Sequence, residues 1–289
     1  MPVCHWCETR PTFKKCHVVS DFVIRYLKAQ SIEGAIYYSW AEKFAQKQIY
    51  GPYFCRDCDN HVIGVWETRF SQDVFPDPMV STHEWGLDSS IKFILSLCYR
   101  YALHNLRVSP HGINSALNEL FRDAGRAALL DTSRVGTQLF VYPYVYRPLT
   151  ATCRLRPGVN QFLTMGFHSR PHPAEDNLPS VLAVYLPRMI FLYSLGDLTL
   201  TGDQDFASFT DLRPGATFAP ATSNVDMPEI FAHYINQGVQ ETKRHLSGWG
   251  FWNWINRRAL PGSDVHQFSA ADQQLKNWQG VHCVGRQFP

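Results

Sequence analysis

The chain has 289 residues, 45% of them hydrophobic and 14% aromatic, enough for one large or two modest domains with a buried core. Its 27 Lys and Arg nearly balance 25 Asp and Glu; the formal net charge of +2 excludes a global charge excess that would recruit nucleic acid or a membrane surface. The longest apolar stretch, residues 181–195, is too short to cross a bilayer and is interrupted by Pro187 and Arg188, so we expect a soluble, cytoplasmic protein without a membrane partner.

The first 75 residues combine two cysteine pairs with amphipathic stretches. Helical spacing of apolar residues predicts a helix over Asp21–Ala29, which Ser20 can cap, and a second helix over residues 40–49, which a Gly-Pro turn ends. A third helix is predicted to begin at the second cysteine pair, because apolar residues recur there at intervals of three and four: Val62, Val65, Trp66 and Phe70.

Residues 71–81, which include Pro76 and Pro78, are predicted to form a linker, and we place a domain boundary there. Residues 1–75 then form one module and residues 82–289 a second domain. Within the second domain we expect helices over residues 87–105 and 113–130, strands within residues 138–146, 161–167 and 181–193, and a helix over residues 228–245 before a Trp-rich stretch. The second domain is therefore predicted to be α+β.

Four cysteines form two identical C-x-x-C spacings, Cys4 with Cys7 and Cys55 with Cys58. Each spacing lets a tight turn direct two thiolates at one cation, and four sulfur ligands are typical of a closed structural Zn²⁺ site. The 47 residues between Cys7 and Cys55 (positions 8 to 54) exceed the usual finger spacing, so a folded insert must bring the pairs together, as treble-clef modules do. The alternative is one or two redox pairs of the thioredoxin kind.

Candidate catalytic residues flank the cysteine turns: Cys16-His17-Val18-Val19 precedes the first helix, and Asp59 follows the last cysteine. In this order the segment resembles the HNH endonuclease family, of ββα-metal architecture. Residues 13–26 and 53–70 look more narrowly like a bacterial subgroup in which a Trp-Glu follows the second cysteine pair, as Trp66-Glu67 does here. The resemblance covers about a quarter of the chain and implies metal-assisted hydrolysis of phosphodiester bonds, with DNA rather than RNA as the expected substrate.

The resemblance also assigns roles to residues. In that family the His before two aliphatic residues is the general base, and His17 occupies its position. The polar residue after the last cysteine ligates a catalytic divalent ion, and Asp59 stands there, with a carboxylate that suits Mg²⁺ or Mn²⁺. A second ligand of this ion is not identified, because Cys16 replaces the expected Asp or His; the nearby substitutes are Asn60, His61, Asp21 and Glu67.

Each assignment has a structural alternative. His17 could be a buried histidine that hydrogen-bonds a carbonyl, Asp59 could cap the last helix, and Cys16 could be a fifth candidate zinc ligand. The rival function is therefore a non-catalytic zinc module that binds nucleic acid or protein as a subunit of a larger complex.

Two further features bear on partners. Basic residues near His17 could grip a nucleic-acid backbone locally: Arg10, Lys14, Lys15, Arg25 and Lys28. The second domain contains no phosphate-binding Gly loop, nucleophile elbow or dinucleotide fingerprint, so we expect it to act as a sensor, a target-binding part or an assembly surface. By analogy, a nuclease-like module fused to such a domain suggests an effector of bacterial anti-phage defence, controlled by a protein partner or by oligomerisation.

Overall fold

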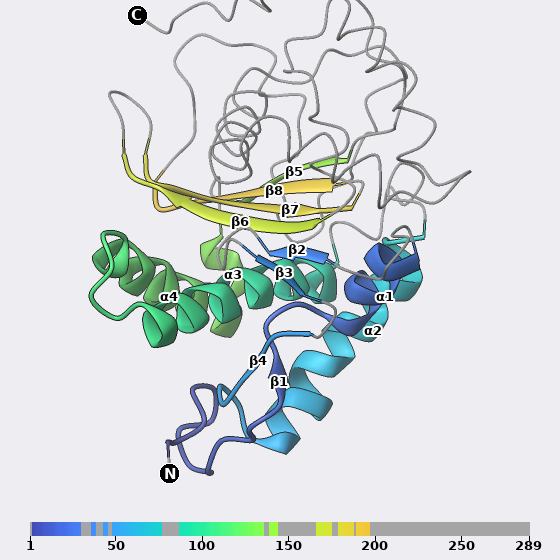
Figure 1. The fold of residues 1–289 in the computed structure, drawn as a ribbon, viewed down its shortest axis with the longest axis horizontal. Coiled ribbons are helices and arrows are strands. Elements are labelled where there is room, and N and C mark those ends of the chain that lie inside the picture. The colour runs from blue at the N-terminus through green and yellow to red at the C-terminus, as the bar shows by residue number, and fades with distance from the viewer. Residues whose placement is uncertain are drawn as a thin grey trace, which may run out of the picture.

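The computed structural model describes residues 2–29, 36–38, 43–45, 48–76, 87–135, 139–143, 166–174, 179–187 and 189–196 (Figure 1). The helix predicted over residues 228–245 and the Trp-rich stretch after it lie outside these residues. Within them the protein combines helices with antiparallel strand pairs, so a mixed α+β structure is confirmed.

The cysteine-rich segment contains one short strand pair and two helical stretches. β1 (Cys16–His17) pairs antiparallel with β4 (Tyr50–Gly51), and α1 (Asp21–Ala29) follows β1 directly. Gly51 is required at its position because a Cβ there would come within 2.2 Å of the Tyr53 ring. The predicted helix over Asp21–Ala29 is confirmed, and it buries Val23, Ile24 and Leu27.

The helix predicted from the second cysteine pair is also confirmed. It begins as a π-helical turn over Cys58–Ile63 and continues as α2 (Gly64–Asp73). The Gly64 N–H donates to the Asp59 carbonyl, the i to i+5 spacing of a π-helix, a geometry that occurs frequently at functional sites. Because α2 runs to Asp73 and Val74 is fully buried, the first residues of the predicted linker belong to a packed helix end.

Two long helices follow, α3 (Asp88–Val108) and α4 (Ser115–Leu130), close to the predicted ranges. They pack against each other, and a Cβ added at Gly125 of α4 would lie 3.7 Å from the Tyr99 Cβ of α3, an ordinary contact distance. A 3-10 turn over Thr132–Arg134 ends this helical pair. Across the described residues, no helix combines the length and the apolar character that crossing a membrane requires.

The main sheet has six strands in the order β3-β2-β6-β7-β8-β5. β5 (Leu139–Pro143), β6 (Gly166–His172), β7 (Val181–Leu186) and β8 (Met189–Ser194) form antiparallel neighbours, whereas β2 (Ile36–Tyr38) pairs in parallel with β6. β7 and β8 are buried along their whole length. Strands are therefore present within residues 138–146 and 181–193; of the strand predicted within residues 161–167, only residues 166 and 167 are described, and they belong to β6.

The helix predicted over residues 40–49 is wrong. β3 (Lys43–Ala45) is a strand that pairs antiparallel with β2, and Tyr50 begins β4. The helical spacing in this stretch is overridden because β2 joins the main sheet through β6, and β3 then extends the sheet edge.

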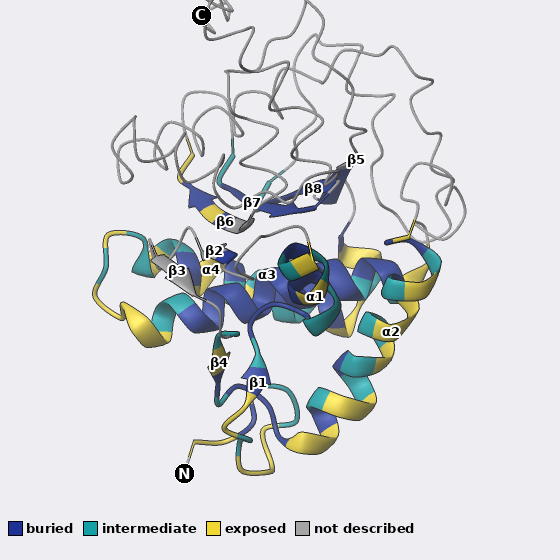
Figure 2. Ribbon diagram, turned by 45° about the vertical axis from the view of Figure 1, so that its right-hand side comes forward, coloured by how far each residue is buried: buried dark blue, intermediate teal, exposed yellow. Residues whose placement is uncertain are grey.

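The core is organised around α3, which both ribbon views place between the sheet and the cysteine-rich segment (Figure 2). Phe93 of α3 stacks on Phe70 of α2 with ring centroids 4.1 Å apart, and Phe22 of α1 lies 5.6 Å from Phe93. Phe70 also meets Phe191 of β8 at 6.4 Å. Aromatic contacts of this kind join the cysteine-rich segment, the helices and the sheet into one hydrophobic core.

Candidate metal centre and the residues beside it

Four thiols converge at the start of the helix that follows β4. The Sγ atoms of Cys4, Cys7, Cys55 and Cys58 all lie within 4.8 Å of one another, and those of Cys7 and Cys55 are 3.9 Å apart. Among the described residues this is the one group of three or more His, Cys, Asp or Glu side chains placed to share a cation. The four thiols are close enough to bind a metal ion such as zinc, as their spacing predicts.

Backbone hydrogen bonds hold the two cysteine turns together. The His5 N–H donates to the Tyr53 carbonyl (2.9 Å), and the Phe13 N–H donates to the Phe54 carbonyl (2.6 Å). Outside the cluster, Arg10 and Asp57 form an exposed ion pair that links the two turns. The insert between the pairs thus brings the second C-x-x-C turn next to the first.

The thiols differ in their electrostatic environment. Burial raises the pKa of Cys4 and of Cys58, whereas hydrogen bonding to Thr9 lowers the pKa of Cys7 to about 6. Cys7 is therefore a thiolate near neutral pH, the form that binds metal. Metal binding by Cys4 and Cys58 would release protons, so occupancy of the cluster increases with pH.

Cys16 does not join the cluster. It is fully buried, and its Sγ donates towards the carbonyls of Phe13 (3.3 Å) and Phe54 (3.2 Å). Burial raises the pKa of Cys16 to about 11, so it stays protonated at neutral pH. The Cys16 thiol therefore packs in the interior between the two cysteine turns.

His17 and Asp59 come from different elements of this segment. His17 is in β1 directly opposite Tyr50, with ring centroids 4.9 Å apart, and its side chain is partly exposed. Asp59 is in the first turn of the π-helix, directly after Cys58. The two side chains come within electrostatic range, because His17 contributes to the pKa of Asp59.

The environment of Asp59 disfavours its charged form. Burial raises the pKa of the Asp59 carboxyl above its ordinary value; Arg100 and His17 oppose this effect, and Glu67 adds to it. Asp59 therefore shares a small, partly buried region with one arginine, one histidine and a second carboxylate.

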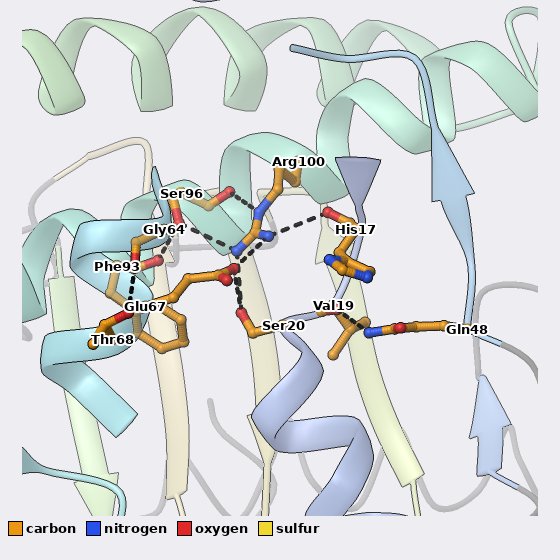
Figure 3. Close-up of polar contacts among 10 residues, drawn as sticks. All are labelled: His17, Val19, Ser20, Gln48, Gly64, Glu67, Thr68, Phe93, Ser96 and Arg100. Carbon is orange, nitrogen blue, oxygen red and sulfur yellow. Dashed lines mark hydrogen bonds and ion pairs between the residues drawn. The ribbon is translucent and has the colours of Figure 1, made fainter. Parts of the chain in front are cut away.

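A buried arginine that the sequence analysis missed lies at the centre of this region (Figure 3). Arg100 of α3 is 1% exposed, and its Nη1 donates to Glu67 Oε1 (2.7 Å) and to the His17 carbonyl (3.2 Å). Its Nη2 donates to the Ser20 hydroxyl (3.3 Å), which itself donates to Glu67 Oε1 (2.7 Å). The signal in the sequence is a single charged residue within the mainly apolar stretch from Phe93 to Leu103.

Ser20 consequently has a different role from the expected one. Its carbonyl accepts from the N–H groups of Val23 and Ile24 and so begins α1, while its hydroxyl bonds to Glu67 and Arg100. The hydroxyl is thus part of a bridge between α1, α2 and α3.

Of the substitutes considered for a second divalent-ion ligand, Glu67 is near enough to affect the pKa of Asp59, but none joins a group of three or more candidate ligands among the described residues. Asn60 and His61 are exposed, and Asp21 pairs with Arg25 at 3.0 Å on the surface of α1. Glu67 Oε1 accepts from both Ser20 and Arg100. Of the basic residues near His17, Arg10 and Arg25 are in ion pairs, while Lys14 and Lys15 are exposed.

Comparison of the chain with protein-family models, with curated protein sequences and with solved structures gave no match. The functional proposal below therefore rests on the residues and their geometry.

Proposed function

We propose that this protein is a metal-dependent endonuclease of the HNH type, which hydrolyses phosphodiester bonds with DNA as the expected substrate. The observation that carries the proposal is the four-thiol cluster, directly after which the chain places Asp59, with His17 near enough to affect the pKa of that carboxyl. The order of elements supports it as well. A C-x-x-C turn, strand β1 with His17, its antiparallel partner β4 and a helix that begins at a second C-x-x-C occur in the order of treble-clef and ββα-metal modules, with α1, β2 and β3 between the two strands.

The proposed roles follow from chemistry and exposure. Zinc at the four thiols would hold the strand pair against the helix and take no part in the reaction. His17 would act as general base, because a partly exposed imidazole can reach a water molecule and accept its proton. A divalent ion such as Mg²⁺ or Mn²⁺, when bound, supplies stabilisation of the negative charge that develops on the phosphate.

The residues present fit such a divalent ion through a single carboxylate. Asp59 offers oxygen ligands, which Mg²⁺ prefers, and a bound cation would offset the burial that disfavours its charged form. Mg²⁺ is commonly held by one or two carboxylates together with water and substrate phosphates. Asp59 would therefore be the protein's main ligand, and substrate would complete the coordination.

A second candidate function is a non-catalytic zinc module that binds nucleic acid or protein. The observation that favours it is the engagement of the neighbouring carboxylates: Glu67 is bonded to Arg100 and Ser20, and Asp21 to Arg25. In this case His17 and Asp59 would contribute to packing and local charge only.

A plasmid-nicking assay with Mg²⁺ or Mn²⁺ separates the two functions. We expect His17→Ala and Asp59→Ala each to lower the nicking rate by at least about 100-fold while zinc content stays unchanged. The matched controls are His61→Ala, which removes an exposed histidine from the same helical turn as Asp59, and Asp123→Ala, which removes an exposed aspartate from α4. Equal nicking by all five proteins, including the parent, would reject the catalytic assignment, and so would absence of nicking in the parent.

A further inference from the structure

Arg100 is the only charged side chain among the largest fully buried side chains of the described residues. It reaches from α3 into the cysteine-rich segment, where it meets three separate stretches of chain: the end of β1, the start of α1 and the middle of α2. Its own helix also holds it, because Nε donates to the Ser96 carbonyl at 3.2 Å. The guanidinium is thus held by hydrogen bonds both to α3 and to the cysteine-rich segment.

The chemistry of these contacts explains why an arginine is needed here. A guanidinium is a rigid planar fork with five donors, so it can bond a carboxylate, a hydroxyl and a carbonyl at once. A buried ion pair adds little stability compared with apolar side chains of similar volume. The particular effect of this one is geometric, because it fixes the main chain of His17 relative to Glu67 and α2.

Arg100 contacts the main-chain carbonyl of His17 and does not bond to its imidazole. In Figure 3 the His17 carbonyl faces the guanidinium, and none of the contacts drawn involves the ring. The Ser20 hydroxyl, three residues further on, is held by the same guanidinium. Arg100 therefore restrains both ends of the four-residue stretch that carries the candidate base into α1.

We propose that Arg100 is a positioning residue, which acts from α3 through the His17 carbonyl and Ser20 to set the orientation of the His17 imidazole. The inference rests on the proposed function in taking His17 as the general base. It adds that the helical pair beyond the cysteine-rich segment supplies part of the active geometry. Residues 1–75 alone would lack this restraint.

A purely structural role for Arg100 makes a different prediction. If Arg100 served only to neutralise Glu67, removing both charges together would restore the fold and the site. If it positions His17, the double variant would regain the fold without regaining the imidazole orientation. Arg100→Met with Glu67→Gln is the informative double variant, and Arg100→Lys is a milder one that keeps the positive charge beside Glu67 without the fork.

The experiment uses the full chain with isotope-labelled histidine, and it assigns the His17 imidazole signals in NMR spectra by comparison with His17→Ala. We expect the double variant and Arg100→Lys to retain zinc and a folded spectrum, to shift the His17 signals, and to lower kcat for nicking about 10- to 100-fold with little change in KM. Arg122→Met, which removes a partly exposed arginine of α4 that pairs with Asp123, is the control and should change neither readout.

The His17 signals test the positioning role, and the nicking rate of the parent tests the nuclease function, so the two proposals can be rejected independently. Unchanged His17 signals in a folded Arg100→Lys or double variant would overturn the positioning role, whatever the nicking rates. Shifted His17 signals in a protein whose parent does not nick DNA would uphold the positioning role and reject the proposed nuclease function.

Discussion

At the scale of single residues, loss of the Arg100–Glu67 ion pair should lower the free energy of unfolding strongly. Arg100 is 1% exposed and the Glu67 side chain is 20% exposed, so neither charge is well solvated. Removing one partner leaves the other buried without compensation, and this costs more than the pair itself contributes.

We expect Glu67→Ala to lower the free energy of unfolding by about 3 kcal/mol, measured by urea denaturation of the zinc-loaded protein. Asp123→Ala is the matched control, because it breaks the more exposed ion pair with Arg122 and should cost no more than about 1 kcal/mol. Similar losses in the two variants would contradict the view that Arg100 depends on Glu67.

Glu8 has a positive φ of 55°, which is rare for a residue with a side chain. It directly follows Cys7, where the chain turns out of the first cysteine pair, and its N–H donates to the Cys4 carbonyl (2.9 Å). Its carboxylate also pairs with Arg126 at 2.9 Å. The backbone at this position is therefore strained for any residue except glycine.

We expect Glu8→Gly to be more stable than Glu8→Ala by about 1 kcal/mol in thermal or urea unfolding. Both variants lose the exposed ion pair with Arg126, so their difference isolates the backbone strain. An alanine variant as stable as the glycine variant would show that the left-handed conformation is absent.

Residue-level prediction from the sequence succeeded where the residue type and its spacing determine the chemistry. The two C-x-x-C spacings predict the thiol cluster because each turn fixes its own two cysteines. The sequence could not predict that Arg100 would meet His17 and Glu67, because that contact depends on how α3 packs on segments far away in the chain.

At the scale of elements, the helices were the most predictable part. The apolar spacing of residues 87–105 and 113–130 corresponds closely to α3 and α4, since long amphipathic helices carry a strong local signal. The stretch at residues 40–49 was not predictable. The pairing partner that brings β2 and β3 into the sheet is β6, whose residues lie more than 100 positions further along.

The N-terminus of α3 carries the clearest pH-sensitive contact outside the candidate site. Asp88 accepts from Lys92 Nζ (2.6 Å) and from the Thr132 hydroxyl (2.7 Å), which ties the helix start to the turn after α4. Burial alone would raise the pKa of Asp88, but the hydrogen bonds from Lys92 and Thr132 outweigh it and lower this pKa below its ordinary value. The folded state therefore favours the carboxylate.

This sign determines the pH dependence. A carboxylate whose pKa is lowered by folding adds stability above its unfolded pKa, and this stability is lost as the pH falls through the folded pKa. We expect Asp88→Asn to be less stable than the parent at neutral pH, by less than about 1 kcal/mol because the pair is partly exposed. The difference should shrink as the pH falls from about 6 towards 3 in paired urea titrations; a difference that grows on acidification would contradict the assignment.

At the scale of the whole molecule, the described residues of the cysteine-rich segment and of the helices and sheet share one hydrophobic core. β2 and β3 lie between the two cysteine pairs in sequence and yet belong to the main sheet. The division into a module of residues 1–75 and a domain of residues 82–289 stays a prediction. If it is correct, the two domains meet through the Arg100 network and the Phe70–Phe93 contact.

The thiol cluster holds the two cysteine turns of the N-terminal segment together. The segment holds its two cysteine turns by a few backbone hydrogen bonds and an exposed ion pair, so a bound metal would supply much of its stability. The positions of His17 and Asp59 depend on the same turns, because β1 follows the first and Asp59 directly follows the second. The geometry of the candidate site therefore depends on metal binding by the four thiols.

The most direct test is the metal content of the purified chain, together with X-ray absorption at the zinc edge. We predict one zinc per chain with four sulfur ligands, unchanged in Cys16→Ser and lost or reduced to three sulfur ligands in Cys58→Ser. A parent protein without zinc, or a Cys16→Ser variant that loses zinc as Cys58→Ser does, would contradict the account.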